Sequence, residues 1–309
     1  MSFRLSRRKF LTTTASVTAT AGAASAMGGF FMPSISRAAD RPMITHGVQS
    51  GDVTANSACI WGRADRASRM ITEIATTENF SRSVRIPHVD VLPERDFAGK
   101  LALNDLPAGQ DVFYKIHFEN LDDGRASSEP VIGHFRTAPA AKRNIRFGWS
   151  GDTAGQGWGI DEDRGGMKTY ATITKHNPDF FIHSGDTIYA DGPFAEQAKM
   201  PDGDIWKNIT TEDTGKVAET LAEFRGNYKY NMLDKNVREF NRLIPVYYQW
   251  DDHEVTNNWY PGEMLTGDDR YSEKSVSLLA ARANRAFREM LPITEHASEP
   301  GRVYRKVSY

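Results

Sequence analysis

The sequence predicts an N-terminal antiparallel β-sandwich followed by an α/β domain. Between residues 40 and 139, short runs of alternating apolar and polar residues are separated by clusters of turn-forming residues. From residue 143 to residue 309, short apolar runs alternate instead with stretches of helical periodicity. The 309 residues are enough for two domains, at the usual size of about 150 residues each.

The first 39 residues form a separate segment that resembles an export signal. The adjacent pair Arg7 and Arg8 precedes a run without ionisable residues from Leu11 to Ser36. That run is rich in Thr, Ala, Ser and Gly, and is too weakly apolar for a transmembrane helix, which needs ~20 strongly apolar residues. We expect a twin-arginine signal peptide, cleaved after Ala38 or Ala39, and export by the twin-arginine machinery to the periplasm or beyond. The alternative is a disordered N-terminus with a chance arginine pair.

Composition excludes several classes of function. The single cysteine, Cys59, rules out an internal disulfide framework and a cysteine-cluster metal site, and we expect its thiol to be buried and inert. The net charge of −2 provides no electrostatic reason to bind nucleic acid or an anionic membrane non-specifically. A phosphate-bearing ligand would therefore have to be held by a local binding site, and a metal cluster is the obvious kind.

The region from residue 40 to residue 139 is predicted to be a small β-sandwich. Strands are predicted at residues 57–63 and 131–136, and the linker to the next domain at residues 137–141. The stretch 103–109, followed by Tyr114, resembles the tyrosine-corner region of fibronectin type III and immunoglobulin-like sandwiches. The residues with the clearest alternation are Val112, Tyr114, Ile116 and Phe118. The histidines have no ligand spacing and are expected to be structural: His46, His88, His117 and His134.

Three apolar runs in the second domain each lead into acidic residues. The runs at residues 145–149, 180–182 and 244–250 precede Asp152, Asp186 and Asp252, respectively. Because ligand sites in α/β sheets lie beyond the carboxyl ends of the strands, we expect these carboxylates to meet at one edge. Helices are predicted between and after these runs, at residues 166–176, 217–230, 234–242 and 272–290.

Such a group of acids favours a bound cation. Close carboxylates repel one another unless a positive charge compensates them. Oxygen ligands with an imidazole such as that of His253 suit Ca, Mg, Mn or Fe. Two such ions about 4 Å apart polarise a phosphoryl group and lower the pKa of a bound water. The alternative is three unrelated solvated loops.

Two motifs resemble a known family. Gly-Asp at residues 185–186 is followed by Tyr-Ala-Asp at residues 189–191, and Trp-Asp-Asp-His-Glu-Val occupies residues 250–255. Together they are similar to the alkaline phosphatase D family (PhoD-like phosphatases), a branch of the calcineurin-like metallophosphoesterases. The order of signal, sandwich and second domain also resembles that family. The resemblance implies an exported alkaline phosphatase or phosphodiesterase that hydrolyses small phosphate esters with metal-bound hydroxide.

The resemblance also implies roles for individual residues. Asp152 would bind the first metal ion, Asp186 would bridge two ions, and Tyr189 would supply a phenolate to ferric iron. Asp252 stands where the wider superfamily usually has an asparagine ligand. The implied cofactors are calcium and iron, and the implied domain is a β-sheet sandwich flanked by helices.

Three further residues receive roles on the substrate side. The resemblance implies that His253 is the catalytic group near the scissile phosphate, where it would stabilise charge or protonate the leaving oxygen. Asn257 and Asn258 would line the substrate site, although both also suit an ordinary loop. The sequence leaves open whether Glu254 orients His253 or faces solvent.

The chain departs from the family pattern in two places. Family members often have Phe-Ala-Ser-Cys-Gln after the first strand, whereas residues 147–152 read Phe-Gly-Trp-Ser-Gly-Asp, so Asp152 replaces the cysteine. The family also contributes further ligands well downstream of the position of residue 309. Residues 302–309 alternate like a strand, and we expect a phosphoesterase domain that is incomplete at its C-terminus.

The sequence also allows other functions. The main alternative is a non-catalytic exported module that binds phosphate or a partner through an incomplete metal site. A serine hydrolase using Ser150 is weaker, because Gly-Trp-Ser-Gly-Asp lacks the second glycine of a nucleophile elbow. Asp-Gly-Asp at residues 202–204 hints at a calcium loop, but no glutamate completes the pattern, so a surface turn is expected.

Overall fold

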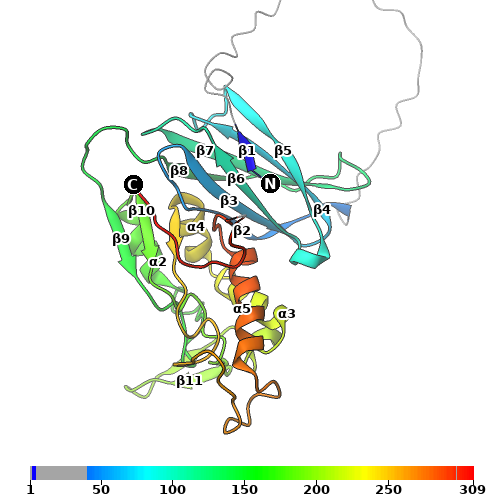
Figure 1. The fold of residues 1–309 in the computed structure, drawn as a ribbon, viewed down its shortest axis with the longest axis vertical. Coiled ribbons are helices and arrows are strands. Elements are labelled where there is room, and N and C mark those ends of the chain that lie inside the picture. Colours follow the sequence, from blue (N-terminus) through cyan, green and yellow to red (C-terminus); the bar gives the residue numbers. More distant parts are fainter. Residues whose placement is uncertain (1, 5–39, 297) are drawn as a thin grey trace, which may run out of the picture.

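The computed structural model describes residues 2–4, 40–296 and 298–309 (Figure 1). The predicted arginine pair, Arg7 and Arg8, and the predicted cleavage site lie outside the described residues. An antiparallel β-sandwich forms the upper part of the view in Figure 1, and strands and helices of an α/β domain lie below it. Both parts of the predicted fold class are therefore confirmed.

The sandwich packs two layers of antiparallel strands against each other. The alternating residues Val112, Tyr114, Ile116 and Phe118 are all fully buried between the layers, as their period of two predicted. The first layer consists of β2 (Ile44–Gly51), β3 (Ser57–Ala64) and β6 (Ala98–Asn104), in the order β6-β3-β2. The short strand β1 (Ser2–Arg4) pairs in parallel with β6. The second has the order β5-β4-β7-β8, from β4 (Ser68–Ala75), β5 (Ser83–Val91), β7 (Asp111–Asn120) and β8 (Val131–Arg136).

Strand β3 is buried on both faces because it lies between two hydrophobic cores. Ala58 and Ile60 contribute to the core of the sandwich, whereas Trp61 points the other way, into the core of the α/β domain. The indole Nε1 of Trp61 donates a hydrogen bond to the carbonyl of Glu289, at 2.9 Å. The thiol of Cys59 is buried on the same strand, as expected, and burial raises its pKa to about 12.

The sheet of the first layer continues into the α/β domain. Its order is β1-β6-β3-β2-β13-β10-β9, where β9 (Phe147–Ser150), β10 (Phe180–His183) and β13 (Val246–Tyr248) are parallel. Strand β13 meets β2 through the pair Val246 and Gly51. The two domains are thus joined by a shared sheet as well as by the predicted linker.

The helices pack mainly on one face of this sheet. They are α2 (Lys168–Lys175), α3 (Leu221–Asn231), α4 (Lys235–Leu243) and α5 (Val276–Met290), with 3-10 turns at Pro93–Arg95 (η2) and Glu212–Thr214 (η3). The predicted helices are present, and each begins later than predicted. The differences are largest for α3 and α5, which Thr220 and Ser275 cap. The predicted apolar stripe of α5 is buried: Leu279, Ala283, Phe287 and Met290. No helix in the described ranges is long and apolar enough to cross a membrane.

Two smaller segments complete the fold. The hairpin of β11 (Gln197–Lys199) and β12 (Ile205–Lys207) carries the Asp-Gly-Asp sequence at its turn, where residues 202–204 are exposed. Residues 302–309 do not form the predicted strand; they are held by side chains instead. Arg305 donates to the buried carboxylate of Asp52 at 2.8 Å, and the rings of Tyr309 and Phe180 pack with centroids 4.6 Å apart.

A charged cluster at the junction of the two domains contains a histidine that is held neutral. Nδ1 of His46 lies 3.2 Å from the guanidinium of Arg63, which forms an ion pair with Asp96 at 3.0 Å. Lys229 of α3 also pairs with Asp96, at 3.2 Å. Burial, together with the charges of Arg63, Lys229 and Arg238, lowers the pKa of His46 to about 3, although Asp96 opposes the shift.

The position of Trp61 predicts a large effect on stability. We expect Trp61→Ala to lower the free energy of unfolding by about 3–5 kcal/mol, because the fully buried indole fills space in the core of the α/β domain. Denaturant unfolding followed by circular dichroism measures this. Tyr260→Ala, at a residue that is 61% exposed, should change stability by less than about 0.5 kcal/mol. Equal effects of both substitutions would contradict the buried position of Trp61 in the core of the α/β domain.

His46 predicts a dependence of stability on pH. The unfolded chain binds a proton at His46 near pH 6.5, whereas the folded chain resists it down to about pH 3. The free energy of unfolding should therefore fall as the pH drops below 6.5, by up to ~1.4 kcal/mol per pH unit from this residue. His46→Gln should flatten that slope in urea titrations between pH 4 and pH 7, and the exposed His88→Gln should not. Identical slopes for both variants would show that His46 is not the responsible group.

Candidate metal centre

Three loops that follow the parallel strands bring the acidic residues together. Asp152 follows β9, Asp186 follows β10, and Asp252 follows β13, and these three strands are neighbours in the sheet. Because parallel strands end at the same edge, the three loops meet there. The structure thus brings together the carboxylates that the sequence predicted to be close.

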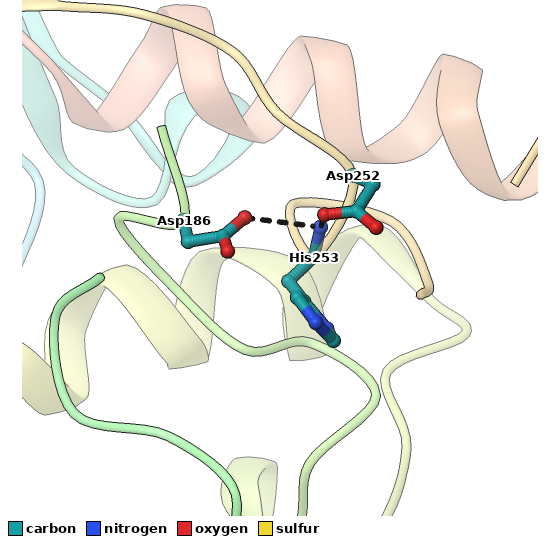
Figure 2. Close-up of side chains that lie close together, drawn as sticks. All are labelled: Asp186, Asp252 and His253. Carbon is teal, nitrogen blue, oxygen red and sulfur yellow. Dashed lines mark hydrogen bonds between the residues drawn. The ribbon is translucent and has the colours of Figure 1, made fainter. Parts of the chain in front are cut away.

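Asp186, Asp252 and His253 form the centre of this group. Each can offer one ligand atom, and these three atoms lie within 4.8 Å of one another. Figure 2 shows the carboxylates of Asp186 and Asp252 directed toward each other from two loops, with the ring of His253 below them. The backbone N–H of His253 donates to Asp186 at 3.3 Å. Oxygen and nitrogen donors at this spacing suit a hard or borderline cation.

Asp152 and Tyr189 extend the group on one side. The hydroxyl of Tyr189 donates to Oδ1 of Asp152, at 2.5 Å, and its ring stacks on His253 with centroids 4.3 Å apart. Burial and the neighbouring carboxylates of Asp152 and Asp186 raise the pKa of Tyr189 well above its usual range. The phenol is therefore protonated in this structure, and its oxygen already lies beside the acidic residues.

Electrostatics oppose this arrangement unless a cation is present. Burial, together with the hydrogen bond to Asp152 and the charge of Asp252, raises the pKa of Asp186 to about 6, although the charge of His253 opposes the shift. Asp186 is 8% exposed, so water screens this repulsion poorly. A positive ion would relieve both the desolvation and the repulsion.

The backbone is strained where two of these acids are placed. Asp152 and Asp186 have φ angles of 58° and 50°, in the left-handed region that residues other than glycine seldom adopt. Gly185, with a φ of 103°, precedes Asp186, and a Cβ there would lie 2.3 Å from Cβ of Asp251. Left-handed turns after β9 and β10 thus direct the carboxylates toward the shared edge.

Glu254 does not orient His253, and it does not face solvent. It is fully buried, and its carboxylate accepts hydrogen bonds from the backbone amides of Thr187 at 2.7 Å, Asp251 at 2.8 Å and Asp186 at 3.1 Å. Burial raises the pKa of Glu254 to about 8, although the amide donors oppose this shift. One side chain therefore ties together the loops that follow β10 and β13.

Asp191 orients His253 instead, which the sequence analysis missed. Its Oδ1 lies 2.7 Å from Nδ1 of His253, and its Oδ2 accepts from the backbone N–H of Asn257 at 2.9 Å. Burial alone would lower the pKa of His253, but the bond and charge of Asp191 raise it above the usual value. The signal was present in the sequence, because Asp191 lies within the Tyr-Ala-Asp motif, but no spacing links it to His253.

The two asparagines contribute to the site through their backbones. The N–H of Asn257 supports Asp191, and the N–H of Asn258 donates to Oδ2 of Asp252 at 2.5 Å. Both residues are exposed. The role of their side chains in substrate binding stays a prediction.

The sequence analysis also missed a buried histidine, His183, at the end of β10. His183 is 2% exposed, and its Nε2 lies 2.6 Å from the hydroxyl of Thr153. Burial lowers the pKa of His183 to about 4, so the ring is neutral. The contact between His183 and Thr153 supports the loop that follows β9. Ser150 would be the nucleophile of the alternative serine hydrolase. Its hydroxyl donates to the carbonyl of Gly151 and makes no hydrogen bond to a histidine within the described part of the chain.

Comparison with known proteins places this geometry in a family. Alkaline phosphatase D of Bacillus subtilis (strain 168) is 24% identical over 279 residues, which cover 86% of this chain and 44% of the relative. A solved structure described as "Structure of PhoD" superposes with a TM-score of 0.64 at 23% identity, covering 85% of this chain and 49% of that one. The chain thus spans about half the length of the relatives that it matches, and the structural likeness supports the α/β fold.

Family profiles match both parts of the chain. The profile of the PhoD-like phosphatase N-terminal domain matches residues 30–139. The profile of the PhoD-like phosphatase itself matches residues 147–309, more than half of the chain. The chain therefore belongs to the PhoD-like phosphatase family.

Proposed function

We propose that this chain is a metal-dependent hydrolase of phosphate esters. The observation that carries the proposal is the convergence of Asp186, Asp252 and His253 at the sheet edge, with ligand atoms within 4.8 Å of one another. Membership of the PhoD-like phosphatase family supports the same chemistry. Small phosphate monoesters or diesters are the proposed substrates, with activity at alkaline pH as in the relative named alkaline phosphatase D.

The donor set fits the proposed ions. Asp152, Asp186 and Asp252 supply carboxylate oxygens, which suit calcium, and the phenol of Tyr189 suits ferric iron once it loses its proton. The raised pKa of Asp186 indicates a site where the carboxylate is unfavourable without a cation. Bound metal ions would polarise the phosphoryl group and acidify a coordinated water.

The remaining residues would position and protonate the substrate. Nδ1 of His253 is engaged by Asp191, so Nε2 is the ring nitrogen that would act on the substrate. The raised pKa of His253 favours the protonated ring, which can stabilise charge on the phosphate or donate a proton to the leaving oxygen. Asn257 and Asn258, on the adjoining loop, are proposed to contact the substrate.

Export is a separate part of the proposal. The Arg7–Arg8 pair and the uncharged run that follows it support recognition by the twin-arginine machinery, which carries folded proteins. Periplasmic or extracellular phosphate esters would then be the accessible substrates. Fusion of residues 1–39 to a reporter that requires twin-arginine export tests this, with Arg7→Lys and Arg8→Lys together as the control.

Asp186 should be essential for turnover. We expect the chain to hydrolyse bis(p-nitrophenyl) phosphate at alkaline pH, to stop in EDTA, and to recover with calcium and iron. Asp186→Asn should lower the rate by more than about 100-fold, because it removes a central ligand charge. Asp202→Asn, in the exposed hairpin turn, should keep the parent rate.

Two outcomes would contradict the proposed hydrolysis. Turnover that survives both EDTA and Asp186→Asn would exclude a metal mechanism at this centre. Metal binding in calorimetry with no turnover of mono- or diesters would favour the alternative, a non-catalytic module that binds phosphate or a partner.

Glu254 should hold the site together without touching the metal ions. Glu254→Ala leaves three backbone amides without their acceptor, so we expect the free energy of unfolding to fall by roughly 3 kcal/mol or more. The milder Glu254→Gln keeps one acceptor oxygen and should weaken metal binding by about 10- to 100-fold while the chain stays folded. Chemical unfolding and calorimetric metal titration measure the two effects. Glu239→Ala, which removes an exposed partner of Arg242, should change neither, and unchanged metal affinity in Glu254→Gln would rule out this bracing role.

A further inference from the structure

A cavity of about 370 Å³ opens directly beside the acidic centre. Its wall begins with Ser150 and Asp152, at the end of β9, and continues under α2 to Met167 and Tyr170. Asp152 therefore belongs both to the proposed metal centre and to this cavity. A volume of this size admits a small organic group.

The far wall of the cavity is aromatic. Trp158, on the loop that follows Asp152, and Trp206, on β12, both line it, with ring centroids 5.9 Å apart and planes at 82°. The indole Nε1 of Trp206 donates to the carbonyl of Gly159 at 3.1 Å, and the guanidinium of Arg164 lies 5.7 Å from its ring. These contacts hold Trp206 in place, so the aromatic wall is already formed without a ligand.

The loop that carries Trp158 also packs against the metal centre. A Cβ at Gly155 would lie 2.2 Å from the ring of Tyr189, so only glycine allows this approach. The backbone N–H of Trp158 donates to the carbonyl of Gly155 at 3.0 Å, which closes the loop. The backbone of Trp158 is thus held close to Tyr189, and its ring packs edge to face with that of Trp206.

We infer that this cavity binds an aromatic group of the substrate, and that Trp158 and Trp206 make the site prefer aryl-bearing phosphate esters. The inference rests on the proposed phosphoesterase function. With the phosphate at the acidic centre, the organic group of the ester has this adjoining cavity to enter. The two indoles, which pack edge to face on each other, line the cavity and offer aromatic surface to a planar ring. A saturated ring of the same size fills the space but gains no stacking.

Paired ligands of equal carbon number test this preference. Benzylphosphonate and cyclohexylmethylphosphonate, which are not hydrolysed, are titrated into the chain loaded with calcium and iron, and binding is followed by calorimetry. Benzyl phosphate and cyclohexylmethyl phosphate, whose leaving alcohols have similar acidity, serve as the matched substrates. We expect the benzyl compounds to be favoured by about fivefold in both Kd and kcat/KM.

Variants of Trp158 and Ile205 assign the preference to the aromatic wall. Trp158→Leu should reduce the ratio between the two ligands to less than about twofold, and Trp158→Phe should retain most of it. Ile205→Ala is the matched control, because Ile205 is the exposed neighbour of Trp206 on β12, does not line the cavity, and should leave the ratio unchanged. Circular dichroism verifies that each variant is folded.

The outcomes separate this inference from the proposed function. Turnover of both phosphates with no aromatic preference, or a preference that survives Trp158→Leu, overturns the aromatic site alone. A binding preference lost in Trp158→Leu, without turnover of either phosphate, overturns the hydrolytic function and keeps the aromatic site. Absence of both binding and turnover overturns both.

Discussion

The acidic edge of the sheet depends on one buried carboxylate, that of Glu254. It accepts hydrogen bonds from the amides of Asp186 and Thr187 after β10, and from that of Asp251 after β13. The two loops cannot separate without leaving several buried N–H groups unpaired, which is costly in a protein interior. The carboxylates of Asp186 and Asp252 are therefore held close by the backbone, before any ion binds. Preorganisation of this kind is what a metal centre requires of its supporting residues.

The acidic cluster destabilises the folded chain when no cation is bound, which argues against a purely structural role. The φ angles of Asp152 and Asp186 are left-handed, and burial among like charges raises the pKa of Asp186 to about 6. Each of these features lowers the stability of the folded chain when no cation is bound. The hydrogen bond from Tyr189 to Asp152 and the contact between His253 and Asp191 place two further functional groups at the same edge. Strain and repulsion concentrated at one site favour the proposed metal centre over three independent loops.

The β-sandwich is structurally continuous with the domain that carries this centre. Trp61 on β3 belongs to the core of the α/β domain, and β2 pairs with β13 at the junction. Asp52, which follows β2, binds Arg305 and the backbone N–H of Thr294 from the other end of the chain. These contacts brace β13, which leads directly into the loop of Asp252 and His253. The sandwich is thus joined to the strand that leads into the candidate metal centre, although none of its residues lies among the proposed ligands.

The sequence by itself determined the features that repeat locally along the chain. Alternation at Tyr114 and its neighbours predicted a strand, the apolar stripe through Leu279 and Phe287 predicted a helix, and acidic residues after three apolar runs predicted a shared edge. Only the tertiary structure decided the contacts between segments far apart in sequence. Asp191 meets His253 across 62 residues, Glu254 reaches amides 67 and 68 residues away, and the cavity joins Trp158 to Trp206. Local patterns can be predicted because they depend only on the period of the backbone and on which face of a short segment meets solvent. The partner of a buried polar group depends instead on how whole elements pack, and residue spacing holds no record of that packing.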